Sequence, residues 1–398
     1  MSDAPFGFDP TDPAFLADPY AVYDRLRAEP GLVWYEPNGW WLVARHADVD
    51  GMLRHRSLGR VFEPKQPYER FAPWNLVNEH AMLELEPPDH TRLRKLVSHA
   101  FTPRRVEALR GRVRELTDEL IDDLASDGRG DLLHDLAEPL PVAVISELLG
   151  IEGQDRELLR PWSNAIVALY EPAADPAVEE AAITAAREFT SYLDDLIARR
   201  REAPGDDLLS ALVQLQLEGD RLTRDELVAT AVLLLNAGHE ASVNVLGNGV
   251  VAMLRDGTQW QRLVEDPDLA APAVEEAIRF DMPLSIFMRT AFDDVQIGDH
   301  ALRAGQVVGL LLASANRDPA VFAEPHRMDI ARSPNPHVGF GAGIHFCLGA
   351  ALARVELQEA FRQLAVRVPT LELADEPPRR RSYQFRGYTS IPVRVTSS

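Results

Sequence analysis

The longest apolar segment of the chain lies between residues 223 and 255. It opens with Thr223-Arg-Asp-Glu226, a capping box whose two side chains can hydrogen-bond the first backbone N–H groups of a helix. The residues that follow, Leu227 to Gly238, are apolar on nearly every side, which is typical of a buried helix. We therefore predict a buried helix from Thr223 to about Arg255, roughly 50 Å long at about 1.5 Å per residue.

Other helices are predicted by apolar residues that recur three or four positions apart. A helix is expected from Leu348 onward, a short one around Asp18 to Ala28, and one after Pro87-Pro88 with Asp89 as its N-cap. Residues 105–200 are predicted to form successive amphipathic helices, with breaks at Gly128 to Gly130 and at Gly150.

Strands are predicted where short apolar runs flank turn residues. Asn38-Gly39 separates the runs Gly31–Tyr35 and Trp40–Ala44, which predicts a β-hairpin. Further strands or turns are expected at Pro283–Arg289, at Val295–Gly309 as a hairpin around Gly298-Asp299, and at Tyr388–Val393.

Two segments show neither the three-to-four-residue spacing of a helix nor the short apolar runs of a strand. Arg60–Glu84 carries three prolines among aromatic residues and is predicted to be a long loop. Trp162–Pro176 is apolar in sequence and is predicted to have an irregular structure. Long loops in compact domains are usually functional or disordered.

Composition narrows the class of protein. Hydrophobic residues make up 46% and charged residues 26% of the 398 residues, as in an ordinary globular protein. The 41 basic and 62 acidic residues give a net charge of −21, which disfavours nucleic-acid binding. The first residues lack the pattern of a signal peptide, and no apolar run reaches the roughly 18 residues of a membrane span. We expect a cytoplasmic protein that binds neither nucleic acid nor membrane.

The only cysteine, Cys347, cannot form an internal disulfide and must be explained by packing or by chemistry. A lone cysteine is usually a small buried hydrophobe. Here, however, Gly341, Gly343 and Gly349 surround it and a predicted helix follows, whose N-terminus favours a thiolate. Such a loop suits a soft-metal ligand, haem iron included. A hydrolase nucleophile would need a base and an orienting group, and only His345 is near in sequence.

The stretch Phe340 to Gly349 resembles the haem-binding signature of the cytochrome P-450 superfamily, Phe-Gly-x-Gly-x-His-x-Cys-Leu-Gly, and matches it at every specified position. The resemblance implies that Cys347 is the axial thiolate ligand of a haem b iron, that Phe340 lies against the haem, and that His345 hydrogen-bonds a haem propionate. It also implies that His90, Arg94 and Arg289 hold the propionates. Without the resemblance, His90 and Arg94 would be interpreted as part of a solvated basic helix face.

The middle of the long helix resembles the family's oxygen-binding pattern, Ala-Gly-x-Glu/Asp-Thr, which forms a local break in the helix beside the iron. Ala237, Gly238 and Glu240 match this pattern, but Ala241 replaces the threonine whose hydroxyl helps to deliver protons to dioxygen. Ser242 is next along the chain, but about 100° of helix rotation separates neighbours, so it cannot simply substitute. Either ordered water or a substrate hydroxyl completes the proton relay, or turnover is inefficient. Some macrolide-hydroxylating relatives also lack the threonine, which favours an oxygenated, polyketide-like substrate.

Glu276 and Arg279 are three residues apart on a predicted helix and can form an ion pair. Alone, this spacing is common and uninformative. Together with Arg332 it resembles the family's buried Glu-Arg-Arg network, which implies a structural role in holding the haem loop.

The remaining expectations concern the surroundings of the haem. Residues 91–114 carry eight basic residues against one acid, either as a solvated face or as a docking site for an acidic electron-transfer partner. By resemblance, the loop at 60–84 covers the haem and the segment at 162–176 is a lid. The expected substrate contacts are Phe71, Trp74, Leu76, Met82, Leu234, Leu284, Ile286 and Thr389.

The resemblance covers nearly the whole chain and implies one mainly α-helical domain, residues 1–398, with a smaller β region. The implied reaction is R–H + O₂ + 2e⁻ + 2H⁺ → R–OH + H₂O on a small organic molecule. Ferredoxin or flavodoxin and its reductase would supply the electrons. Two alternatives stay open, namely peroxide-driven or oxygen-independent chemistry, and a haem-binding or sensor protein without turnover.

Overall fold

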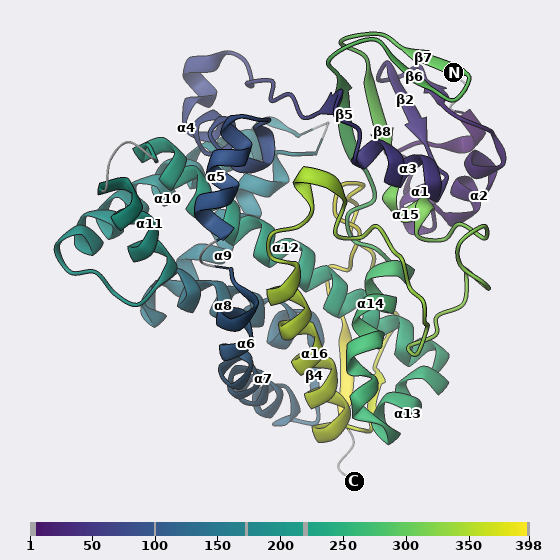
Figure 1. The fold of residues 1–398 in the computed structure, drawn as a ribbon. Helices are drawn as coiled ribbons and strands as arrows, with labels where there is room; N and C mark the ends of the chain where they lie inside the picture. The colour runs from purple at the N-terminus through teal and green to yellow at the C-terminus, as the bar shows by residue number, and fades with distance from the viewer. Residues whose placement is uncertain (1–4, 99–100, 172–173, 218–221, 396–398) are drawn as a thin grey trace. The chain divides into compact units, whose positions relative to one another are not determined.

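The computed structural model describes residues 5–98, 101–171, 174–217 and 222–395. Most of them are helical, and the strands are short, so the mainly α fold with a smaller β region is confirmed (Figure 1). The chain forms two compact units, which are described separately, and the expectation of one domain stays a prediction. The helix α12 (Arg224–Asp256) contributes to both units, because the boundary between them falls after Glu240.

Unit 1 comprises residues 1–59, 114–137 and 241–398 and contains all of the sheets. A five-stranded sheet has the order β1-β2-β8-β5-β3, with β2 and β8 parallel and the other pairs antiparallel. A three-stranded sheet has the order β4-β10-β9, and β6 and β7 form a hairpin. The strands are β1 (Val33–Tyr35), β2 (Trp40–Val43), β3 (Leu58–Gly59), β4 (Arg129–Asp131), β5 (Phe287–Ala291), β6 (Val295–Ile297), β7 (His300–Leu302), β8 (Val307–Leu310), β9 (Leu371–Leu373) and β10 (Pro392–Val395).

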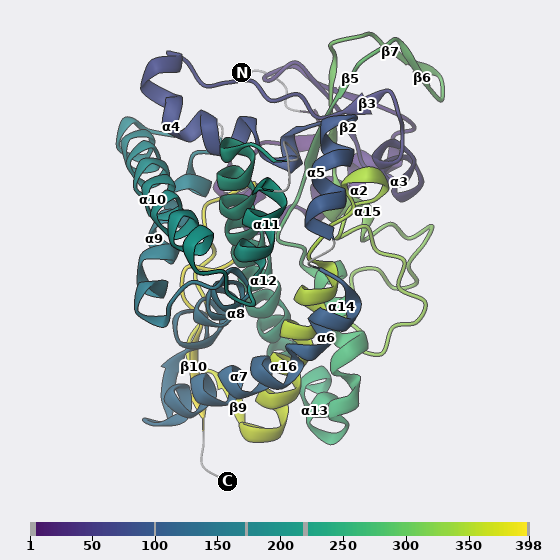
Figure 2. The same ribbon diagram turned by 60° about the vertical axis from the view of Figure 1, so that its left-hand side comes forward.

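The helices of unit 1 pack tightly in places where glycine permits it. Gly249 of α12 is such a place, since a Cβ atom there would lie 2.8 Å from Ala277 of α14 and 2.8 Å from Phe361 of α16. Figures 1 and 2 show α13, α14 and α16 side by side. The helices are α1 (Pro13–Ala17), α2 (Tyr20–Ala28), α3 (His46–Leu53), α13 (Thr258–Glu265), α14 (Ala270–Phe280), α15 (Leu312–Ala315) and α16 (Ala350–Arg367), with most of α7 (Arg110–Ala125) and the second half of α12.

Unit 2 comprises residues 60–113 and 138–240, and its described part contains helices and connecting loops but no strand. Its helices α9 and α10 run side by side, and α4 packs on α10 (Figure 2). The helices are α4 (Tyr68–Glu79), α5 (Asp89–Ser98), α6 (Pro103–Ala108), α8 (Pro139–Leu149), α9 (Arg156–Ala168), α10 (Pro176–Glu202) and α11 (Leu208–Leu217), with the start of α7 and the first half of α12.

Several predicted elements are confirmed. The capping box forms as expected, because the Thr223 N–H donates to Glu226 at 2.8 Å and the Glu226 N–H donates to the Thr223 hydroxyl at 3.1 Å. The hairpin at Asn38-Gly39 pairs Tyr35 with Trp40, and the hairpin at Gly298-Asp299 pairs β6 with β7. Gly150 ends α8 with the left-handed backbone that its type favours.

Two predictions of element type were wrong, and one predicted strand has different bounds. The loop at 60–84 contains α4, whose buried residues Phe71, Trp74 and Val77 lie three apart on one helix face, although Pro73 stands inside it. The irregular segment at 162–176 is helical up to Ala168, because α9 extends through Trp162, and residues 172–173 lie outside the described residues. The strand expected at Pro283–Arg289 runs instead from Phe287 to Ala291, since its ladder with β8 begins at Phe287.

Candidate functional site

The loop that holds Cys347 is fixed by backbone hydrogen bonds to its own motif. The Cys347 N–H donates to the Phe340 carbonyl at 2.9 Å, and the Ala350 N–H contacts the Cys347 carbonyl at 3.4 Å. Cys347 therefore stands just before α16, near the helix N-terminus, as the sequence predicts. Gly343 has φ +70°, and a Cβ atom there would lie 2.6 Å from the Leu53 carbonyl oxygen, so only glycine fits.

This loop exposes apolar side chains beside the cysteine. Ile344 and Phe346 are 47% and 41% exposed, although the flanking Ala342 and Ala350 are buried. His345 and Cys347 are half-buried between them. Large exposed apolar groups around a thiol suit a flat apolar cofactor that carries a soft metal, so the residues present fit a haem.

The oxygen-binding pattern lies on α12, where burial changes abruptly. Asn236, His239 and Glu240 are buried, but Ala237 is exposed and Gly238 is half-buried. One side of an otherwise buried helix is therefore open at the two smallest residues of the pattern. The expected local break is absent, because α12 is a continuous helix through Ala241; a single glycine costs only about 1 kcal/mol of helix propensity.

Sequence reasoning missed the partner of Ser242. Ser242 is buried on α12, and its side chain hydrogen-bonds Glu356 of α16, which is 3% exposed. Burial raises the pKa of Glu356 to about 8, since the charged form loses its hydration. A protonated carboxylic acid thus contacts the hydroxyl beside Ala241, where the family's threonine is missing. A signal was present, because Glu356 lies four residues after Leu352 on the apolar side of α16.

The expected propionate ligands are charged or polar side chains at two places. In unit 2, α5 carries His90, which is 2% exposed, and Arg94, which is half-buried. In unit 1, Arg289 on β5 is 2% exposed and donates to the Met288 carbonyl at 2.9 Å.

The three residues of the predicted network lie together in unit 1. Both carboxylate oxygens of Glu276 accept hydrogen bonds of 2.7 Å from Arg279, and both side chains are fully buried. Arg332 adds a contact of 3.0 Å to Glu276. Since Glu276 and Arg279 pair with each other, their burial is physically tolerable, and Arg332 is half-buried beside them.

Of the expected substrate contacts of unit 2, Leu76 is half-buried and the others are buried, namely Phe71, Trp74, Met82 and Leu234. Trp74 already uses its indole N–H, which donates to the Ile166 carbonyl at 3.1 Å. A narrow hollow is lined by residues close to these contacts in sequence and by Tyr170. The lining residues are Val77, Asn78, Ala81, Leu83, Glu84, Tyr170, Val232, Leu233 and Asn236. These roles stay predictions.

The expected contacts of unit 1 differ in burial. Ile286 is 3% exposed and packs in the core of the five-stranded sheet, and Leu284 is partly buried against the same core. Thr389 is exposed, and its N–H donates to the Pro378 carbonyl at 2.9 Å.

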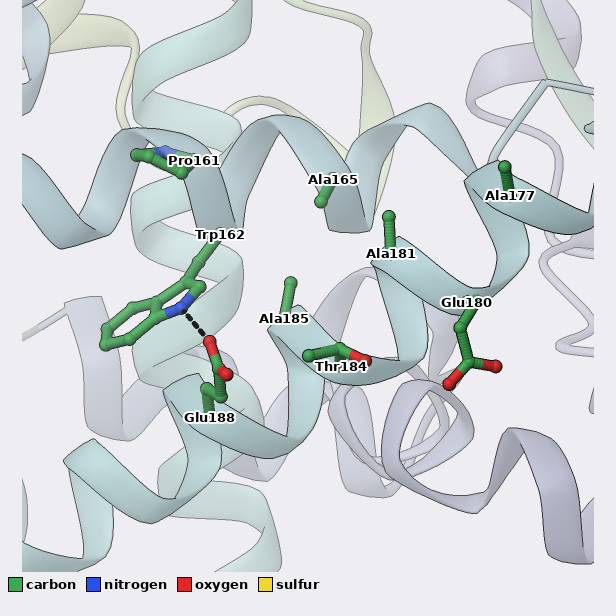
Figure 3. A pocket seen from close by; sticks show the side chains of 9 residues that line it. All are labelled: Pro161, Trp162, Ala165, Ala177, Glu180, Ala181, Thr184, Ala185 and Glu188. Atoms are coloured by element: carbon green, nitrogen blue, oxygen red, sulfur yellow. Dashed lines mark hydrogen bonds between the residues drawn. The ribbon is translucent and has the colours of Figure 1, made fainter.

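A larger open groove, of about 580 Å³, lies between α9 and α10 (Figure 3). Its floor is made of alanines, and at one end the Trp162 indole N–H donates to Glu188 at 2.9 Å. None of the expected substrate contacts lines it. The lining residues are Pro161, Trp162, Ala165, Ala177, Glu180, Ala181, Thr184, Ala185 and Glu188.

The basic run at 91–114 is partly neutralised. Arg92 pairs with Glu226, Arg110 with Glu107 at 2.6 Å, and Arg112 with Glu147 at 3.1 Å. In unit 1, Arg114 pairs with Glu359 at 2.9 Å. Lys95, Arg104 and Arg105 are exposed.

In the described part of the chain, every helix is too short or too polar to cross a membrane.

Comparison with known proteins gives one consistent result. A family model described as Cytochrome P450 matches residues 55–365. Cytochrome P450 107B1 from Saccharopolyspora erythraea is 42% identical, over 96% of this chain and 96% of its own. The 6-deoxyerythronolide B hydroxylase of the same organism is 39% identical, over 96% and 97%. The solved structure of the Bacillus subtilis 168 bacillaene polyketide synthase cytochrome P450 PksS has a TM-score of 0.89 and 37% identity, over 98% of this chain and 100% of that one.

Proposed function

This chain belongs to the cytochrome P450 family, and we propose that it hydroxylates an oxygenated, polyketide-like small molecule. It is a monooxygenase of the family that binds haem and uses dioxygen and small organic substrates. The substrate class is supported by two relatives whose names refer to 6-deoxyerythronolide B and to a polyketide synthase.

Haem bound through a thiolate supplies the activation of dioxygen, because the thiolate donates electron density that favours O–O cleavage. We assign Cys347 as the iron ligand and Phe340 as a contact of the ring, and Gly349 ends the loop ahead of α16. His90, Arg94, Arg289 and His345 are assigned to the two propionates, which need charge-assisted donors. Glu276, Arg279 and Arg332 are assigned to hold the segment that leads to the loop.

The observation that carries the proposal is the hydrogen bond between Ser242 and the buried, protonated Glu356. Hydroxylation consumes two protons, and Ala241 has no hydroxyl to pass them on. Ser242 cannot occupy the threonine's place on the helix, but it is the next residue along the chain and its side chain hydrogen-bonds Glu356. Ser242 and Glu356, together with a substrate hydroxyl or water beside Ala241 and Gly238, would complete the path. An oxygen-rich substrate fits this arrangement, since it brings its own hydroxyl. Glu240 is buried next to Ala241 in sequence and is assigned to the same proton path.

The electrons are proposed to come from ferredoxin or flavodoxin and its reductase. The exposed Lys95, Arg104 and Arg105 offer positive charge to such an acidic partner.

The test is an optical titration of the ferric protein with macrolides, terpenes, steroids and aromatic acids, followed by product analysis. We expect a substrate-induced spin shift with macrolides or related polyketides, and a hydroxylated product that requires dioxygen and the redox partner. A shift confined to another class would overturn the substrate proposal.

The missing threonine also favours a second candidate, namely peroxide-driven chemistry. It predicts product with hydrogen peroxide alone at rates that rival those with the redox partner. Dependence of the product on the partner and on dioxygen would exclude it.

A further inference from the structure

A second charged cluster lies behind the cysteine loop, apart from the Glu276 network. Glu275 of α14 receives two hydrogen bonds from Arg354 of α16, from Nε at 2.7 Å and from Nη2 at 2.8 Å. A bidentate, charge-assisted pair of this kind fixes the orientation of the guanidinium plane. The pair is partly shielded from solvent, since the Arg354 and Glu275 side chains are 34% and 25% exposed.

His337 joins the same carboxylate. Its Nε2 lies 3.0 Å from Glu275, and its Nδ1 lies 3.1 Å from the Gly339 N–H. Because a backbone N–H can only donate, Nδ1 accepts and the ring proton is on Nε2, which donates to Glu275. The His337 side chain is 3% exposed, so this geometry is held in the interior of unit 1.

Arg354 and His337 both lie against the ring of Phe340, whose backbone carbonyl accepts a hydrogen bond from the cysteine loop. The Arg354 guanidinium lies 4.4 Å from the centre of the Phe340 ring, and the His337 ring lies 5.9 Å from it. The Phe340 carbonyl in turn accepts the Cys347 N–H. Arg354 lies in the second turn of α16, whose N-terminus follows directly on the cysteine loop.

The charges of this cluster persist over a wide pH range. Burial opposes ionisation of Glu275, but hydrogen bonds from Arg354 and His337 lower its pKa to about 2. The hydrogen bond to Glu275 raises the pKa of Arg354, and the negative charge of Cys347 adds to the effect. Arg354 is thus a permanent cation that interacts electrostatically with the cysteine.

We propose that Arg354 is a positioning residue whose charge, oriented by Glu275, raises the reduction potential of the haem at Cys347. Reduction adds one electron to the haem–thiolate unit, and a nearby cation stabilises the added negative charge. The proposal rests on the assigned ligation by Cys347 and holds for any substrate.

The experiment is a spectroscopic redox titration of the purified haem proteins, with four variants beside the wild type. Arg354→Gln removes the cation, and we expect the equilibrium constant for one-electron reduction to fall about tenfold, which is a shift of about −59 mV. Glu275→Gln removes the opposing anion and should shift the potential upward. Arg354→Lys keeps the charge and should stay within about threefold of the wild type in the same constant.

The matched control is Arg362→Gln, which removes an arginine from the same helix where it pairs with the exposed Asp268. Opposite shifts in Arg354→Gln and Glu275→Gln distinguish a charge effect from general loosening of the loop, which would move both in one direction. Shifts of the same sign, or shifts no larger than that of Arg362→Gln, overturn the proposal.

One fallback criterion and one further measurement separate the possible failures. If Arg354→Gln does not bind haem, Glu275→Gln decides the question: an upward shift larger than that of Arg362→Gln supports the proposal, and a downward shift or none overturns it. The absorption of the reduced carbon monoxide complex of the wild type tests thiolate ligation. Without the thiolate-type band, the assignment of Cys347 fails and the Arg354 proposal with it; with the band and no shifts, only the role of Arg354 fails.

Discussion

Glu356 is the residue whose chemistry is least apparent from its type. A glutamate on a helix is usually solvated and ionised, but here it is buried against Ser242 and retains its proton near neutral pH. Burial raises the pKa of Glu356, whereas the hydrogen bond with the Ser242 hydroxyl lowers it in part, and two predictions follow from this pair.

The first concerns coupling of oxygen consumption to product. We expect Ser242→Ala and Glu356→Gln to lower the amount of product per dioxygen consumed at least about tenfold, because a positioned proton-transfer group typically contributes about 10²–10⁴-fold. Haem content and the substrate-induced spin shift should remain, since neither residue is assigned to them. Oxygen uptake, peroxide release and product are measured together. Ser163→Ala, at another buried serine, is the control, and unchanged coupling in both variants contradicts the proposed path.

The second concerns stability and pH. The folded-state pKa of Glu356 is raised from 4.5 to about 8, so between these values the folded protein holds a proton that the unfolded chain releases. The stabilisation is therefore complete below pH 4.5 and is lost as the pH rises toward 8, by at most about 1.4 kcal/mol per pH unit. Glu356→Gln should gain stability relative to the wild type from pH 5 to pH 8.5 in urea unfolding. Glu372→Gln, on an exposed strand position, should show no such trend.

At the scale of the helices, the stability of α12 depends on the capping box at its N-terminus and on the close packing that its glycines allow. In the capping box, the backbone N–H groups of Thr223 and Glu226 each donate a hydrogen bond to the other residue's side chain. We expect Thr223→Ala to lower the free energy of unfolding by about 1 kcal/mol, the usual cost of a lost N-cap. Denaturant unfolding measures it, with Thr184→Ala in the middle of α10 as the control. Equal effects of the two substitutions would mean that the cap contributes nothing.

Gly249 allows a second prediction about the helices, and its control is a glycine whose replacement by alanine should change the stability in the opposite direction. Gly249→Ala places a methyl group 2.8 Å from Ala277 and Phe361, and overpacking of this kind typically costs about 1–3 kcal/mol. Gly51→Ala on α3 meets nothing within 4 Å and should gain up to about 1 kcal/mol of helix propensity. The melting temperatures of the two variants should therefore move in opposite directions; a stabilised Gly249→Ala variant would show that the helices can separate.

The elements that sequence predicted well are those with a local chemical signal. The capping box at Thr223 and the Asn38-Gly39 turn each define a backbone geometry within four residues. The helix α4 was missed because Pro73 suggested a break, although its buried face repeats every three residues. The apolar run at Trp162 looked irregular because Pro161 stands inside α9.

Among the candidate site residues, too, those in a recognisable pattern were predicted from the sequence and the others were missed. The cysteine motif and Glu276 with its two arginines are visible as patterns, since the motif is local and the network has a known spacing. Glu356 and Arg354 were missed, because a charged residue on a helix is normally solvated and its burial depends on segments far apart in sequence. Glu356 contacts a residue 114 positions away, and the pairing of Arg354 with Glu275 spans 79 positions.

For the molecule as a whole, the net charge of −21 bears on the choice of electron donor. An acidic protein repels an acidic ferredoxin at long range, so encounter depends on local positive charge. Four of the eight basic residues at 91–114 are paired with acids. Of the other four, Arg94 is half-buried, and Lys95, Arg104 and Arg105 are exposed.

We therefore expect Lys95→Gln combined with Arg105→Gln to slow reduction by an acidic ferredoxin severalfold at low ionic strength. The difference should vanish at about 1 M salt, where the screening length is only about 3 Å. Stopped-flow reduction of the haem measures it, and Arg303→Gln, an exposed arginine of unit 1, is the control. A defect that persists at high salt would indicate altered structure rather than lost steering.

The single cysteine has a practical consequence as well as a chemical one. If Cys347 binds the haem iron as we propose, any cysteine introduced on the surface is the only thiol open to a maleimide or a nitroxide reagent. Pairs of labels, one on α4 and one on α16, can therefore be attached without first removing native thiols. Pulsed electron paramagnetic resonance would then report how the separation of the two helices is distributed before and after a substrate binds.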